Sequence, residues 1–243
     1  MKLAVMTAAV FPTIDEAQRK LWIFLRSWEK FGTGYDLHLF GTGRIFPGYR
    51  VMGAEWVLEK LHELKNGYSH ALFSDSWDAF FCARVEEIEA KYRAMGSPQI
   101  LVSAYIGLGN ESDMSSYVGC FDESIPYRFP NRGGWIAEIP AMIEMLERMT
   151  KSYPDAGDEC FLWYWAWREN WFRPVLDSNC GIFQVSDVNA SISSTMNLRE
   201  PARLYNNLTQ SRPCILHLSG GYTDPETGKD EALKPWARAL GVI

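Results

Sequence analysis

The sequence HALFSDSWD, residues 70–78, joins a short apolar run to two acids. The run has the length of a buried strand, and Asp75 and Asp78 follow where that strand ends. In an open α/β sheet, ligands bind beyond the carboxyl ends of the strands. Two carboxylates held close together repel each other unless a cation lies between them, and their oxygens suit Mg²⁺ or Mn²⁺. A structural interpretation stays open, in which Asp75 closes a turn and Asp78 caps the next segment.

Strands and helices alternate on both sides of this stretch in the first half of the chain. Apolar runs predict strands, and apolar residues at helical spacing predict the helices between them. The alternation predicts an α/β fold in which a mostly parallel sheet is flanked by helices. The predicted strands are residues 2–10, 35–40, 70–74 and 99–105, and the predicted helices are residues 14–31, 54–64 and 85–95.

The second half of the chain is less regular. Residues 107–134 are rich in Gly, Ser, Asn and Asp and have no periodicity, which is typical of a functional loop or lid. No repeat or low-complexity linker divides the chain, so we expect a single domain over residues 1–243. The predicted elements here are helices at 136–149, 158–171 and 235–240 and strands within 174–185 and 213–218.

Composition excludes several classes of protein. The chain has 243 residues, of which 47% are hydrophobic and 22% charged, so it is globular rather than disordered. A net charge of −6 argues against a broad basic face for nucleic acid. The five cysteines are widely spaced with no CxxC pair, which predicts reduced thiols and a cytoplasmic location. No apolar run is long enough to span a membrane, and the first residues fit a buried strand better than a signal peptide.

Two further segments carry candidate functional residues. His217 ends an apolar run and precedes Gly220 and Gly221, so an imidazole and exposed backbone amides could complete a metal and phosphate site. A hydrogen-bonded core histidine is the alternative. Asp158 and Glu159 open the helix predicted at 158–171, where acids also stabilise the helix dipole.

Five motifs occur in the order found in one known family. The segments are the acid-Ser-aromatic-acid (DxxD) motif at 75–78, FPNRGGWIA at 129–137 for the LNSGG segment, Asp158-Glu159-Cys160 for Asp-Asp-Gln, the LDxxxxIFQ segment at 176–184, and His217-Leu218-Ser219-Gly220 for HGNG. By these segments the chain resembles the glycosyltransferase domain of the lysyl hydroxylases (procollagen-lysine glycosyltransferases) and the related GT-A proteins of large viruses and phages. The resemblance covers nearly the whole chain, up to about residue 222.

This resemblance implies a GT-A-like (Rossmann-like) fold that binds a UDP-sugar as donor and Mn²⁺ (or Mg²⁺) as cofactor. Its metal ligands are Asp75, Asp78 and His217, and the ion neutralises charge on the departing UDP. Residues 1–106 become the nucleotide-binding half and residues 107–243 the acceptor and sugar half. The remaining roles are nucleotide contacts by Thr7 and Trp77, phosphate contacts by Gly220 and Gly221, and contacts to the donor sugar or the acceptor by the catalytic residues Asp158 and Glu159.

The chain departs from the family pattern at several positions. Arg132 replaces a small polar residue and could pair with a phosphate. Glu159 and Cys160 stand where the family has Asp and Gln, so sugar contacts differ. Leu218 and Ser219 replace the Gly-Asn of HGNG, and Lys229 is the candidate for the basic residue that follows that motif in the family.

Three interpretations of function are compared. The first is a metal-dependent glycosyltransferase that moves a hexose or another sugar to a hydroxyl. The second is a catalytically silent nucleotide-sugar or carbohydrate-binding module on the same fold, which the retained metal ligands disfavour. The third is a phosphoesterase, which is disfavoured because a two-metal site needs several His and Asp ligands and the chain has only four histidines.

The acceptor is the open part of the first interpretation. DNA with hydroxymethylated bases (in phage), a hydroxylated protein side chain and a glycan are all compatible with it, and a phage enzyme would work in the host cytoplasm. A flipped base could stack on Trp163, Trp165 or Trp167, which at helical spacing are otherwise core residues. The family resemblance favours retention of stereochemistry, and no membrane partner is expected.

Overall fold

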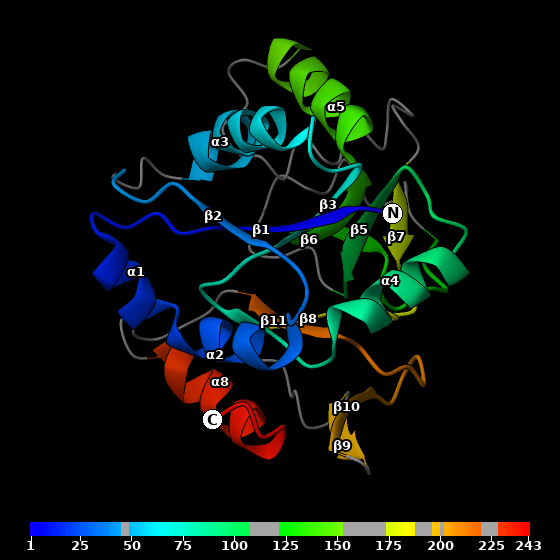
Figure 1. Ribbon diagram of the computed structural model, residues 1–243. Coiled ribbons are helices and arrows are strands. Elements are labelled where there is room, and N and C mark those ends of the chain that lie inside the picture. The colour runs from blue at the N-terminus through cyan, green and yellow to red at the C-terminus, as the bar shows by residue number, and fades with distance from the viewer. Residues whose placement is uncertain (45–48, 107–121, 153–173, 188–195, 200–201, 220–227) are drawn as a thin grey trace.

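A central six-stranded sheet organises the molecule (Figure 1). The computed structural model describes residues 1–44, 49–106, 122–152, 174–187, 196–199, 202–219 and 228–243. The strand order is β2-β1-β3-β6-β5-β7, and all neighbours are parallel except β6, which is antiparallel to both β3 and β5. The bounds are β1 Leu3–Ala8, β2 Leu37–Phe40, β3 His70–Ser74, β5 Ile100–Tyr105, β6 Phe129–Glu138 and β7 Val175–Asp177.

Helices α3 (Tyr49–Leu64) and α5 (Ile139–Ser152) cover one face of this sheet (Figure 1). Their apolar side chains, among them Leu61, Met142 and Met145, pack on Met6 and other residues of the strands. These side chains are fully buried, and burial of each contributes about 1.5–3 kcal/mol relative to exposure. This helical layer therefore buries one face of the six-stranded sheet.

The other face packs against α2 (Trp22–Phe31), α4 (Val85–Ala94) and a second sheet. That sheet has the order β4-β11-β8, with β4 at Ala79–Phe81, β8 at Phe183–Asp187 and β11 at Ile215–Ser219. β11 is parallel to β8 and antiparallel to β4. Because β4 follows β3 after a short turn, the chain passes from the first sheet to the second at residues 75–78.

Two helices and a hairpin complete the described fold. Helix α1 (Ile14–Lys20) is capped at its N-terminus by Thr13, whose hydroxyl accepts a hydrogen bond from the backbone N–H of Glu16. Helix α8 (Gly228–Ala239) packs on α2 and on the second sheet. The hairpin of β9 (Met196–Arg199) and β10 (Arg203–Asn206) lies beside the second sheet, away from α3 and α5 (Figure 1).

The predicted α/β architecture is confirmed, with differences in detail. The helix expected over 14–31 is two helices that meet at Leu21, whose backbone is not helical. The helix expected from residue 136 begins at Ile139, because residues 136–138 extend strand β6. Strand β6 occupies part of the stretch expected to be irregular, and the sequence did not predict β4, β9 or β10. The helix expected at 158–171 lies outside the described residues.

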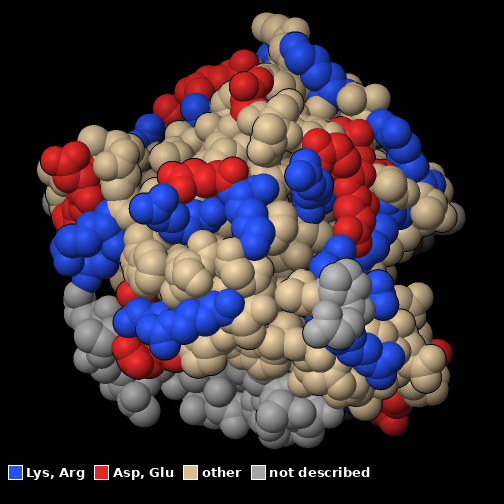
Figure 2. Space-filling model, turned by 60° about the horizontal axis from the view of Figure 1, so that its bottom comes forward, with Lys and Arg blue, Asp and Glu red and all other residues tan. Residues whose placement is uncertain are grey.

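Two expectations from composition can be compared with the structure. Within the described part of the chain, Cys82, Cys180 and Cys214 are buried free thiols. No described helix combines the length and hydropathy needed to cross a membrane. Figure 2 shows one face of the molecule, on which basic and acidic side chains alternate instead of forming a continuous basic surface.

Candidate metal and nucleotide-sugar site

The turn at residues 75–78 is fixed by backbone and side-chain hydrogen bonds. The N–H of Asp75 donates to the carbonyl of Gly133 in β6 (2.8 Å), and the hydroxyl of Ser76 donates to the carbonyl of Ala8 at the end of β1 (2.8 Å). The carbonyl of Asp78 accepts from the N–H of Leu218 in β11 (2.9 Å). The turn is therefore held by both sheets, which fixes the direction of its two carboxylates.

The pairing of β4 with β11 brings a histidine to these acids. His217 lies opposite Ala79, the residue after Asp78. Its Nε2 atom is 3.1 Å from Oδ1 of Asp78 and 3.6 Å from Oδ2 of Asp75. His217 and Asp78 are nearly buried, whereas the side chain of Asp75 is 33% exposed. The three side chains predicted as metal ligands thus converge from two different sheets.

The electrostatics of the cluster are unbalanced. Desolvation raises the pKa of Asp75, and the nearby Asp78 raises it further, against the opposing charges of His217 and Arg132. Burial alone would lower the pKa of His217, but the charge and hydrogen bond of Asp78, with the charge of Asp75, outweigh it and raise that pKa. The Nδ1 atom of His217 is buried without a hydrogen-bond partner among the described residues. In the absence of another cation, a proton on this cluster relieves the repulsion.

The donor set fits a divalent cation. One ligand atom from each of Asp75, Asp78 and His217 lies within 4.8 Å of the other two. Ligands at about 2.1 Å from an octahedral ion are about 3 Å apart, close to the separations of the Nε2 atom from the two carboxylates. Two oxygens and one imidazole nitrogen suit Mn²⁺ or Mg²⁺, and an octahedral ion keeps further positions for water or phosphate oxygens.

Strand β6 makes a close approach to this cluster at a glycine. A Cβ atom on Gly133 would lie 2.2 Å from Cε1 of His217 and 2.7 Å from Oδ2 of Asp75. Any other residue would force one of the two ligands to move. The sequence shows the small residues of this segment, but it does not show that they face His217 from the other sheet.

The predicted nucleotide contacts lie next to the turn. Trp77 is half-buried, with its ring centroid 5.9 Å from that of Phe11 and the ammonium of Lys229 4.4 Å above its ring. Thr7 is fully buried in β1, and its hydroxyl has no hydrogen-bond partner among the described residues. Gly220, Gly221, Asp158 and Glu159 lie outside the part of the chain that the structure describes.

Asp177, the acid of the LDxxxxIFQ segment, has a structural role. Asp177 is buried, and its carboxylate accepts hydrogen bonds from the backbone N–H groups of Gly181, Ile182 and Phe183, each at 2.8 Å. These bonds close the turn between β7 and β8. Burial raises the pKa of Asp177, and the three bonds oppose that rise. This acid fixes a loop and does not join the metal cluster.

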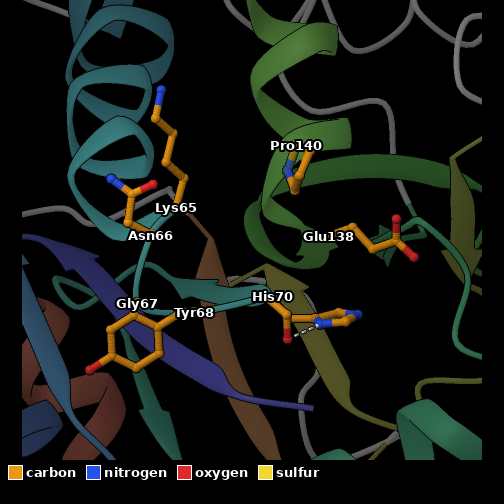
Figure 3. A pocket seen from close by; sticks show the side chains of 8 residues that line it. Lys65, Asn66, Gly67, Tyr68, His70, Glu138 and Pro140 are labelled. Carbon is orange, nitrogen blue, oxygen red and sulfur yellow. Dashed lines mark hydrogen bonds between the residues drawn. The ribbon is translucent and has the colours of Figure 1, made fainter.

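A hollow in the surface lies at the amino end of β3, opposite to the end that carries Asp75. It has a volume of about 490 Å³ and lies between the end of α3 and the start of α5, as Figure 3 shows. His70, the first residue of β3, is hydrogen bonded through Nδ1 to the hydroxyl of Ser69 (2.9 Å). The hollow is at the amino end of the strand that carries Asp75 at its carboxyl end, so it is separate from the metal cluster. Its lining residues are Lys65, Asn66, Gly67, Tyr68, Ser69, His70, Glu138 and Pro140.

Comparisons with known proteins agree with the geometry. The family model described as the PLOD GT domain matches residues 2–224. The fold is similar to the crystal structure of a glycosyltransferase involved in the glycosylation of the major capsid of PBCV-1, with a TM-score of 0.57 and 10% sequence identity over 96% of this chain and 100% of that one. No curated protein matches the chain. The family model spans most of the sequence, and the chain therefore belongs to the PLOD GT domain family of glycosyltransferases.

Proposed function

We propose that this glycosyltransferase moves a hexose or another sugar from a UDP-sugar to a hydroxyl acceptor and that it requires Mn²⁺ or Mg²⁺. The observation that carries the proposal is the convergence of Asp75, Asp78 and His217 at the carboxyl end of β3. Ligand sites of open α/β sheets lie at such an edge. The raised pKa of Asp75 suits a cluster whose negative charge a bound cation balances.

In this proposal each residue has a separate task. A bound divalent ion supplies Lewis-acid chemistry, because it neutralises the charge that develops on the departing UDP. Asp75, Asp78 and His217 hold that ion, and Gly133 leaves room beside it. We assign the nucleotide contacts to Trp77 and to the hydroxyl of Thr7, which has no partner among the described residues. The phosphate contacts are assigned to the backbone amides of Gly220 and Gly221. Asp158 and Glu159 act on the donor sugar or the acceptor as base, orienting group or stabiliser of positive charge.

The acceptor hydroxyl belongs to a protein side chain, a glycan or a modified DNA base. The net charge of −6 supports the first two over nucleic acid. The similar structure named above is involved in the glycosylation of a major capsid, which is compatible with either a protein or a glycan acceptor. We therefore rank a protein or glycan hydroxyl above DNA.

The proposal is tested by release of UDP from a panel of UDP-sugars, with Mn²⁺ and with EDTA. We expect metal-dependent hydrolysis of one donor, which identifies the sugar before the acceptor is known. Asp78→Ala should abolish this release, whereas Asp15→Ala, which removes the same side chain from an exposed position on α1, should leave it unchanged. Release that is equal in EDTA would contradict the metal requirement.

The same assay separates the enzyme from the silent module. A module binds a UDP-sugar and never releases UDP, with or without an acceptor. Binding measured by calorimetry together with no release from any donor would therefore replace our proposal with that alternative. Neither binding nor release for any UDP-sugar would reject UDP-sugars as the donor class.

A further inference from the structure

Strand β6 carries a bulge directly beside the metal cluster. Ser103 of β5 lies opposite Asn131, whereas the residue before it lies opposite Trp135. Residues 132–134 are therefore left over on the side of β6 that faces β5. On the other side, the pairing of β6 with β3 runs without a break to Gly134. Such extra residues bend a strand and locally disrupt its ladder of hydrogen bonds to one neighbour.

A chain of three hydrogen bonds holds this bulge in place. Ser103 is fully buried, and its hydroxyl donates to the carbonyl of Asn131 (2.7 Å) across the break in the ladder. The carboxamide oxygen of Asn131 accepts from the N–H of Gly133 (2.9 Å). The carbonyl of Gly133 in turn accepts from the N–H of Asp75 (2.8 Å). The chain of bonds thus runs from β5 through the bulge to one of the candidate metal ligands.

The bulge limits how far the candidate ligands can move. A Cβ atom on Gly133 would overlap both Cε1 of His217 and Oδ2 of Asp75, so the backbone of Gly133 lines the cluster on the side of β6. The turn at residues 75–78 is itself held by hydrogen bonds to β1 and β11. While the bulge keeps its place, His217 and Asp75 cannot spread apart towards β6.

The freedom of ligands to spread decides which ion a site takes. Ca²⁺ binds oxygen ligands at about 2.3–2.6 Å and tolerates irregular geometry, whereas Mg²⁺ needs nearly octahedral geometry at about 2.0–2.1 Å. Mn²⁺ also favours an octahedron of such ligands. A rigid cluster therefore favours the smaller ions, and a cluster whose ligands can move loses part of this preference.

We propose that Ser103 and Asn131 are positioning residues, which hold the bulge against Asp75 and His217 and make the metal site select Mn²⁺ or Mg²⁺ over Ca²⁺. Both residues act on the cluster through Gly133. The inference rests on the function proposed above, because it concerns the same metal site, and it adds what sets the choice of ion. It also gives the buried hydroxyl of Ser103 a task beyond the pairing of two strands.

The test is calorimetric binding of Mn²⁺ and of Ca²⁺ to the full chain, with the electron paramagnetic resonance spectrum of bound Mn²⁺ as a second readout. Ser103→Ala removes the first hydrogen bond of the chain, and Asn131→Ala removes the second. For each variant we expect about tenfold weaker Mn²⁺ binding, a change of less than threefold for Ca²⁺ and a broader Mn²⁺ spectrum. Asn131→Ser keeps a weaker acceptor for the N–H of Gly133, so its ratio of Mn²⁺ to Ca²⁺ affinity should lie between those of Asn131→Ala and the wild type.

Ser211→Ala is the matched control. The hydroxyl of Ser211 also donates to a backbone carbonyl, that of Cys180 (2.9 Å), and it lies before the start of β11, whereas His217 lies near the end of that strand. Its loss removes a hydrogen bond between two distant segments, as Ser103→Ala does. Both metal affinities and the Mn²⁺ spectrum should match those of the wild type.

The outcomes separate this inference from the proposed function. A lower ratio of Mn²⁺ to Ca²⁺ affinity in the alanine variants supports the positioning role, because general damage would weaken both ions alike. An unchanged ratio, or equal losses for both ions, overturns it and leaves the glycosyltransferase proposal intact. If circular dichroism shows that the alanine variants do not fold, the ratio measured for Asn131→Ser decides in the same way. Wild-type protein that binds no Mn²⁺ rejects the proposed metal site itself.

Discussion

Two clusters of charged side chains in this molecule have opposite electrostatic designs. Around Glu87 of α4, two cationic side chains surround one carboxylate. Arg203 of β10 donates two hydrogen bonds to its carboxylate (2.6 and 2.8 Å), and Lys91 lies 2.8 Å from it. Around Asp75, two carboxylates share one imidazole.

The pKa values of the two acids show the same contrast. Partial burial of Glu87 would raise its pKa, but the hydrogen bonds and charges of Arg203 and Lys91 lower it to about 2. Desolvation and the neighbouring Asp78 raise the pKa of Asp75 instead. An acid that is paired with cations stabilises the folded chain, whereas two acids that repel each other cost stability unless a ligand completes the cluster. The two clusters should therefore respond differently to the same kind of substitution.

The largest difference is expected for Asp78→Asn. Loss of one of three metal ligands should lower metal-dependent UDP release about a hundredfold or more, because even outer partners of metal ligands typically contribute 10–100-fold. Without metal, the variant should be at least as stable as the wild type, because one of two repelling charges is gone. Activity assays and urea denaturation in EDTA measure the two effects. A variant that keeps full activity would show that the cluster is not the metal site.

Glu87→Gln should give the reverse result. We expect the free energy of unfolding to fall by about 2 kcal/mol, less than for a fully buried pair because a third of the side chain remains exposed. UDP release at 25 °C should change less than twofold, since Glu87 does not contact the metal cluster. Large losses of activity with unchanged stability would contradict the structural role of this acid.

The effect of Glu87→Gln should also depend on pH. The pKa of Glu87 in the folded chain, about 2, lies below its ordinary value of 4.5, so the ionised acid stabilises the fold above about pH 5. That contribution is lost as the pH falls from about 5 towards 2. Urea denaturation of both proteins at several pH values should show the stability difference shrinking over this range. A constant difference from pH 7 to pH 2 would contradict the ion-pair explanation.

The sequence distinguishes these clusters only in part. Asp75 and Asp78 are recognisable as candidates because they follow an apolar strand. Ligands of open α/β sheets bind at the carboxyl ends of strands, and the structure has both acids at the carboxyl end of β3. Glu87 follows Glu86 at the start of a helix, where the sequence looks like an ordinary solvent-exposed helix face. Its partner Arg203 is 116 residues away along the chain. Strand β6 was missed because Pro130, Gly133 and Gly134 interrupt its pattern, although the interruption is what allows contact with His217. The parts that the sequence did not predict thus depend on contacts between distant segments.

Gly133→Ala tests whether the shape of the unbalanced cluster matters as well as its charge. The added methyl group would overlap His217 and Asp75, so one of them must move. We expect Mn²⁺ affinity to fall about tenfold, because ligands must keep their geometry around the ion. Gly67→Ala is the matched control, since the nearest atom to its added methyl group is 3.8 Å away. Equal Mn²⁺ affinities for both variants and the wild type would show that the cluster adapts.

The smallest effect is expected for Lys229→Met, at a place where the Lys229–Asp230 pair borders the turn at residues 75–78. Lys229 is 3% exposed, donates to the carbonyl of Lys20 (2.6 Å) and pairs with Asp230 (2.9 Å), which also accepts from the indole N–H of Trp22. Asp230 is 22% exposed and keeps the hydrogen bond from Trp22, so its charge is less uncompensated than in a fully buried pair, and the variant should lose only about 1–2 kcal/mol of stability. Because the ammonium lies over the ring of Trp77, its loss should also change Trp fluorescence, while Mn²⁺ affinity changes less than threefold. A tenfold loss of Mn²⁺ affinity would instead join Lys229 to the metal cluster, as a positioning residue that acts through Trp77.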